Sequence, residues 1–166
     1  MPSTYTLISS NVLASSAASV TFSSIPSTYT DLVLRVSARP DSSGDAYLTF
    51  NGVAGTSYSS TDLQGTGSVA QSSRQSNTSR VRLQNFASTT TANTFASAEI
   101  YIPSYAATIK KPVSAISADE ANATAAFITA TAGLFSNTSA ITSVTLTYSS
   151  LFVSGSSFYL YGIKNS

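Results

Sequence analysis

Seven carboxylates are the groups in this sequence best suited to acid–base chemistry. Hydrolysis of a glycosidic bond needs two of them on opposite sides of a sugar, with pKa values held apart by their surroundings. Nothing in their spacing marks such a pair. We predict Asp31 and Glu99 on outward strand faces, Asp41, Asp45 and Asp62 in turns, and Asp119 and Glu120 beside a turn. On that prediction all of them are solvated surface groups.

The segment Asp41-Ser42-Ser43-Gly44-Asp45 gathers oxygen atoms in a compact turn, as a calcium site requires. It lacks the alternating acidic ligands and the distal glutamate of an EF-hand. We therefore predict a tight turn whose aspartate side chains accept hydrogen bonds from backbone N–H groups.

Histidine and cysteine are both absent from the 166 residues. Their absence excludes a Ser-His-Asp triad, a cysteine nucleophile, a Cys/His zinc site and a disulfide. A Ser–Lys hydrolase would need Lys110, Lys111 or Lys164 buried beside a serine. The first two are adjacent and are expected at a charged strand end, and the third is close to the end of the sequence. The sequence therefore predicts a protein without catalytic residues, metal or cofactor.

Arginines and tyrosines are the remaining candidates for binding. The formal net charge is +1 and the pI is about 7.9, whereas a nucleic-acid-binding domain normally has a clear basic excess. Arginine suits ion pairs at interfaces, and tyrosine combines a flat apolar ring with a polar tip. The candidates for a partner or subunit interface are Arg74, Arg80, Arg82, Tyr58, Tyr159 and Tyr161. A solvated face for the arginines, and a filled monomer core for the tyrosines, remain alternatives.

Alternation of apolar and polar residues along the chain predicts the strands that must position these groups. In the segment 31–38, for example, Leu32, Leu34 and Val36 share one face, and in 18–23 Val20 and Phe22 point inward. The predicted strands are 5–9, 18–23, 31–38, 47–50, 80–86, 94–102, 113–118, 126–134, 142–148 and 157–163. Turn residues such as Asn51-Gly52 separate them. The pattern indicates one all-β domain over residues 1–166, an antiparallel sandwich or barrel of about 8–10 short strands.

Two segments fit this pattern less well. Residues 52–79 contain few large apolar side chains, so we expect long loops there, with one short strand near Tyr58. Residues 118–127 are rich in alanine and could hold a helical turn, but Thr124 and the alternation that follows favour a strand.

Several segments resemble small virion proteins of tailed bacteriophages. The resemblance lies in Tyr5-Thr6-Leu7-Ile8-Ser9-Ser10, in residues 18–26 and 29–35, in Leu48-Thr49-Phe50-Asn51-Gly52, in Glu99-Ile100-Tyr101-Ile102-Pro103 and in residues 156–163. It covers nearly the whole chain and carries no catalytic residue. It implies a β-sandwich of jelly-roll type that assembles into a virion as a homotrimer.

Two functions are consistent with the resemblance and the low charge. The first is a capsid decoration, or cement, protein that binds the major capsid protein on the outer surface of the shell and stabilises it by mass action. The alternative is a tail- or head-fibre module that recognises carbohydrate on the host surface through tyrosine rings and the segment 52–79. No signal peptide or span of about 20 apolar residues is evident. We therefore expect synthesis in the host cytoplasm and a final location on the virion, with neither nucleic acid nor membrane as a partner.

Overall fold

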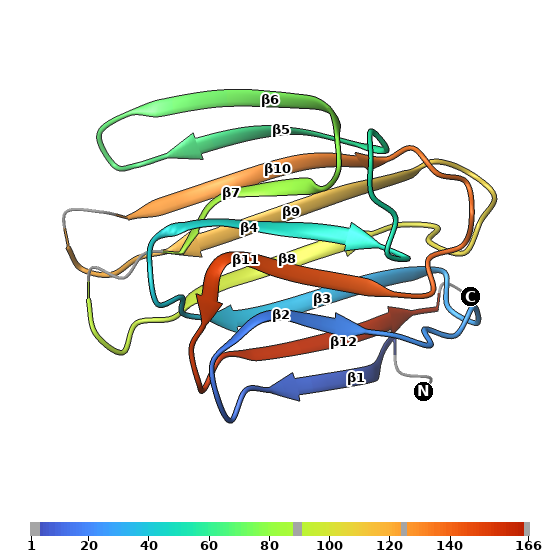
Figure 1. Ribbon diagram of the computed structural model, residues 1–166, viewed down its shortest axis with the longest axis horizontal. Coiled ribbons are helices and arrows are strands. Elements are labelled where there is room, and N and C mark those ends of the chain that lie inside the picture. The colour runs from blue at the N-terminus through green and yellow to red at the C-terminus, as the bar shows by residue number, and fades with distance from the viewer. Residues whose placement is uncertain (1–3, 88–90, 124–125, 165–166) are drawn as a thin grey trace.

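The computed structural model describes residues 4–87, 91–123 and 126–164, and within them all regular structure is β-strand (Figure 1). The strands are β1 (Tyr5–Val12), β2 (Ala17–Phe22), β3 (Asp31–Ala38), β4 (Gly44–Phe50), β5 (Tyr58–Gly65), β6 (Ala70–Thr78), β7 (Val81–Ala87), β8 (Ala96–Ile102), β9 (Lys111–Asp119), β10 (Phe127–Phe135), β11 (Val144–Phe152) and β12 (Ser157–Ile163). The prediction of an all-β antiparallel sandwich is confirmed.

The strands form two antiparallel sheets of unequal size. The large sheet has eight strands in the order β1-β12-β3-β8-β9-β10-β5-β6, and the small sheet has four in the order β2-β11-β4-β7. Strand β7 packs over β10, β9 and β5, whereas β6 lies beyond it at the edge of the large sheet (Figure 1). The large sheet therefore has an inner face against the small sheet and an outer face that no described strand covers.

The core fills the space between the two sheets. Every side chain predicted to point inward from 31–38 and 18–23 is buried, as are Leu48, Phe50 and Ile100. The rings of Phe50, Tyr58 and Phe135 pack together, with 4.9 Å between the centroids of Tyr58 and Phe135. The period-2 alternation of the sequence is thus the alternation between core and surface that a pleated strand produces.

Two expectations for the irregular segments are corrected. Residues 52–79 form the hairpin β5–β6 instead of long loops, and Tyr58 begins a strand of eight residues. Strand β5 pairs with β10 along its whole length, and its inward positions are largely polar, so its sequence lacks the usual apolar alternation. In the segment 118–127 the described residues contain no helical turn, but the favoured continuous strand is also wrong: β9 ends at Asp119 and β10 begins at Phe127, and Thr124 lies outside the described residues.

High pH tests the core through its buried tyrosines. Burial raises the pKa of Tyr58, Tyr101, Tyr105 and Tyr148 above the usual 10. The unfolded chain therefore loses these phenolic protons at a lower pH than the folded protein does. Stability from the neutral phenols is complete below pH 10 and is lost as the pH rises through their folded pKa values. Each phenol lowers the free energy of unfolding by about 1.4 kcal/mol per pH unit in that range.

Lys111 changes the stability of the fold in the opposite direction as the pH rises, but only up to pH 10.5. Burial lowers its pKa from 10.5, so the cost of its charge in the folded state disappears as the pH approaches that value. Urea unfolding between pH 10.5 and pH 12 therefore isolates the tyrosines. We expect Tyr148→Phe to reduce the slope of stability against pH by at least about one quarter, since it removes the most strongly shifted of four phenols. An unchanged slope would show that Tyr148 does not contribute.

Candidate functional site

The expectation that Asp62 lies in a solvated turn is wrong. Its carboxylate lies on the inner face of β5 and is fully buried, beside an Arg82 side chain that is 15% exposed. Arg82 Nη2 donates to Asp62 Oδ2 at 2.9 Å, and Thr131 Oγ1 donates to Asp62 Oδ1 at 2.8 Å. Ser73 and Gln84 complete the cluster, with 2.8 Å from Ser73 Oγ to Gln84 Oε1. This buried polar cluster joins β5 and β6 to the edge strand β7 of the small sheet.

Asp31 and Asp119 are also buried, contrary to the prediction. Asp31 accepts hydrogen bonds from the Tyr101 hydroxyl at 2.9 Å and from the Ser104 backbone N–H at 2.8 Å, so it fixes the end of β8. Asp41 stays exposed and accepts from the Leu151 backbone N–H at 3.0 Å, as predicted for this turn. A hydrogen bond with the Ser150 side chain lowers the pKa of Asp41.

Lys111 is fully buried and does not form a charged strand end. Its ammonium donates to the backbone carbonyl of Thr138 at 3.1 Å and to that of Ile109. Loss of hydration on burial lowers its pKa. Because its described partners are backbone carbonyls, Lys111 ties the start of β9 to neighbouring loops and is not paired with a serine nucleophile.

The six predicted interface residues lie in different parts of the molecule. Tyr58 is in the core, where its hydroxyl donates to Val53 O at 3.1 Å, so its ring cannot contact a partner. Arg82 is held by Asp62, and the Arg80 guanidinium lies 3.5 Å from the centroid of the Tyr47 ring. Arg74 is exposed on β6. The three arginines therefore do not form one cationic surface.

Tyr159 and Tyr161 lie on the outer face of the large sheet, which is the candidate functional site. Both are partly exposed, in line with their alternation with the buried Phe158 and Leu160. Beside them is the ion pair of Arg35 and Glu99, in which Nε donates to Oε2 at 3.1 Å. The two side chains are 56% and 51% exposed, so the pair is solvated, and for Glu99 the outward position was predicted.

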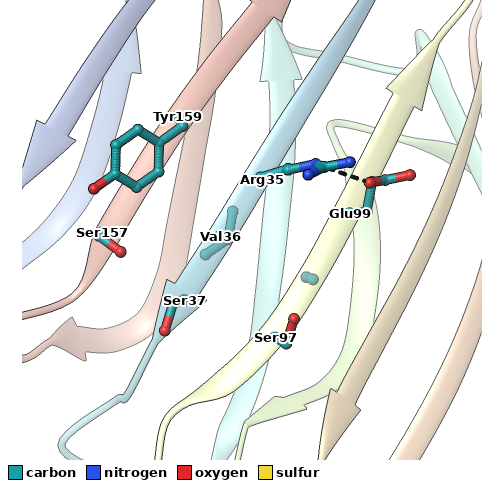
Figure 2. Close-up of a pocket in the computed structure, with 8 residues that line it drawn as sticks. Arg35, Val36, Ser37, Ser97, Glu99, Ser157 and Tyr159 are labelled. Atoms are coloured by element: carbon teal, nitrogen blue, oxygen red, sulfur yellow. Dashed lines mark hydrogen bonds and ion pairs between the residues drawn. The ribbon is translucent and has the colours of Figure 1, made fainter.

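A shallow depression of about 440 Å³ lies beside this pair. Figure 2 shows the side chains that line it, which come from the adjacent strands β12, β3 and β8. The polar residues of this lining are Arg35, Ser37, Ser97, Glu99, Ser157 and Tyr159, and we call them the polar zone. The sheet register places them in two parallel rows, Ser157-Ser37-Ser97 and Tyr159-Arg35-Glu99.

The other half of the outer face is apolar and was not predicted. Leu63 on β5, Ile116 on β9 and Ile128 on β10 are 61%, 59% and 59% exposed. Alanines lie between them: Ala130 is opposite both Leu63 and Ile116 in the register. All residues of these three strands are described, and none of their outward positions carries a charge. We call the outward residues of β5, β9 and β10 the apolar zone.

A signal for the apolar zone was present in the sequence. Ile116 and Ile128 alternate with the inward residues of two predicted strands, so both faces of those strands carry apolar side chains. Leu63 lies beside them because β5, which was expected to be a loop, pairs with β10. Contiguous exposed apolar surfaces of this kind are often interaction sites, so the apolar zone is a candidate partner surface.

The part of the chain that the structure describes contains no group of three or more Asp and Glu residues arranged to hold a metal ion. No helix among the described residues is long and apolar enough to cross a membrane.

Comparison with known proteins adds no family to this picture. No protein-family model matches the chain, and no curated protein matches it significantly.

Proposed function

We propose that this protein is a structural component of a bacteriophage virion, a capsid decoration protein that binds the major capsid protein on the outside of the shell and stabilises it. The observation that carries the proposal is the uncharged apolar zone on the outer face of the large sheet. The role is structural and involves no catalysis. Its other support is the resemblance of several segments to virion proteins of tailed phages.

The size of the apolar zone suits one side of a contact between proteins. Three strands about 4.8 Å apart, with about nine residues at 3.3 Å each, cover roughly 400 Å². Stable interfaces bury about 800 Å² on each partner, with an apolar centre and a polar rim. The apolar zone would form the centre, and the polar outward residues of β6 would form part of the rim.

The strand order supports the jelly-roll relationship that the resemblance implies. Consecutive strands lie in opposite sheets except within β5–β6 and within β8–β9–β10. A jelly roll alternates between two facing sheets in this manner, with one pair of consecutive strands in the same sheet. The strand order of this protein would follow from that of a jelly roll if the hairpin β9–β10 were inserted beside β8, and if β1 and β12 were added at one edge of the large sheet.

Weak contacts suffice for such a role. A protein that binds only the assembled shell stabilises that state by mass action. If copies associate, as the expected homotrimer would, each additional contact becomes intramolecular and raises the overall affinity. Low charge is compatible with close packing among neighbours, since only 9% of residues are charged.

A binding experiment with shells that lack the protein tests the proposal. We expect the native protein to co-sediment with them and to raise the temperature at which they rupture. The variant Leu63→Ser/Ile116→Ser/Ile128→Ser should bind about a hundredfold more weakly, because each exposed side chain contributes about 1 kcal/mol when it is buried. Leu151→Ser is the matched control, since this exposed leucine lies on the small sheet.

Circular dichroism would establish that the triple variant is folded. Its folding should be preserved because all three side chains are more than half exposed. Native binding by the triple variant, or failure of the native protein to bind shells, would refute the proposal.

A further inference from the structure

The polar zone has an ordered geometry that the proposed role in the shell does not use. Ser37 is directly opposite Ser157 on one side and Ser97 on the other, and Arg35 is likewise opposite Tyr159 and Glu99. Side chains in such positions have Cβ atoms about 5 Å apart. In Figure 2 the three serines lie along one row and Tyr159, Arg35 and Glu99 along the next. The small serine side chains leave the space of about 440 Å³ next to the larger row.

The hydrogen-bonding groups of this zone are largely unused within the described structure. Arg35 donates to Glu99 through Nε, and both side chains are more than half exposed, so its two Nη groups and Glu99 Oε1 have no described hydrogen-bond partner. No described residue forms a hydrogen bond with the side chains of Ser37, Ser97, Ser157 or Tyr159. The guanidinium is nevertheless held in place, because it also lies 5.5 Å from the centroid of the Tyr5 ring. The zone therefore offers fixed donors and acceptors to a ligand.

The charges of the zone indicate the class of ligand. One guanidinium and one carboxylate lie in contact, so the site has no net charge. An anionic ligand would meet Glu99, and a cationic ligand would meet Arg35. A sugar hydroxyl both donates and accepts, so one hydroxyl can accept from Arg35 Nη while its neighbour donates to Glu99 Oε1. The partly exposed ring of Tyr159 offers an apolar surface for the C–H face of the sugar.

We infer that the polar zone is a binding site for a neutral carbohydrate, with Arg35 and Glu99 binding adjacent hydroxyls and Tyr159 packing against the ring. The volume is at the lower end of the range of about 300–1,000 Å³ for small-ligand sites. Because the depression is shallow and solvated, the affinity for one sugar unit is expected to be on the order of millimolar. The site is separate from the apolar zone and does not depend on attachment to a shell.

Ligand-observed NMR with the full chain tests this inference. The probes are methyl glucopyranoside, methyl galactopyranoside, methyl mannopyranoside and sialyllactose at millimolar concentration. We expect at least one neutral sugar to bind, and to bind better than sialyllactose. Arg35→Ala should weaken binding about tenfold through loss of a charged hydrogen bond. Ser37→Val/Ser97→Val should abolish it by filling the depression without changing any charge.

Control variants separate this site from the proposed attachment surface. The variant Leu63→Ser/Ile116→Ser/Ile128→Ser should bind sugar normally, and Arg35→Ala should bind shells normally. The inference would be overturned if no neutral sugar bound, if sialyllactose bound more tightly, or if the double serine variant bound sugar as well as the native protein. None of these results would affect the test with shells.

Discussion

Replacing Asp62 by alanine is expected to lower the free energy of unfolding by about 3–5 kcal/mol. The carboxylate is fully buried, with Arg82 Nη2 at 2.9 Å and Thr131 Oγ1 at 2.8 Å. Without it, the largely buried guanidinium has lost its counter-charge, and the Thr131 hydroxyl has lost its acceptor. The cost is that of an uncompensated charge inside the protein, which far exceeds the net contribution of an intact ion pair. Urea unfolding at pH 7 measures it.

Glu99→Ala is the matched control for this prediction. The pair of Arg35 and Glu99 has a similar distance, 3.1 Å, but both side chains are more than half exposed. Water screens an exposed pair and solvates the remaining partner, so we expect a loss below about 1 kcal/mol. Equal losses of unfolding free energy in the two variants would show that burial does not determine the cost of breaking the pair of Asp62 and Arg82.

Phe22→Ala is expected to cost about 3–5 kcal/mol, because it removes a large buried ring and leaves a cavity. Phe22 is 4% exposed on β2 and lies opposite Val144 of β11, which is fully buried. The substitution therefore removes packing between β2, the edge strand of the small sheet, and the core. The midpoint of urea unfolding should shift strongly to lower urea concentration.

Thr21→Ala provides the control from the same strand. Thr21 points outward, and its hydroxyl hydrogen-bonds to that of Thr145 at 2.9 Å on an exposed surface. Loss of one exposed hydrogen bond should cost about 1 kcal/mol or less. If Phe22→Ala unfolded at the native midpoint, the assignment of inner and outer faces on β2 would be wrong.

Strands with an apolar inner face could be predicted from the sequence. Segments 31–38 and 157–163 match β3 and β12, and Val20 and Phe22 point inward as expected. Alternation identifies such strands because the pleat turns every second side chain toward the core. Strand pairing across long sequence separations, such as β1 with β12, cannot be derived from this local pattern.

Strand β5 and its buried carboxylate could not be predicted for a specific reason. Its inward positions include Ser60, Asp62 and Gln64, which resemble loop residues in composition. Arg82 and Thr131 supply the partners of Asp62, and Thr129 supplies one for Gln64, all from other strands, whereas Ser60 Oγ has no described hydrogen-bond partner. Burial of a polar residue depends on such partners, and the partners are not neighbours in the sequence.

The candidate site was predictable only in part. Tyr159 was predicted to be available for contact because it alternates with Phe158 and Leu160, and it does lie in the polar zone. The alternation in 31–38 puts Arg35 on the face opposite to Leu34 and Val36, but its pairing with Glu99 depends on the register of β3 with β8. Leu63 was assigned to a loop, and its place in the apolar zone depends on the pairing of β5 with β10.

The number of copies in purified phage particles, measured by quantitative mass spectrometry against the major capsid protein, tests the central proposal most directly. A decoration protein repeats with the symmetry of the shell, so we expect on the order of hundreds of copies per particle. Tens of copies or fewer would contradict it, and would instead support the alternative of a fibre module that recognises the host.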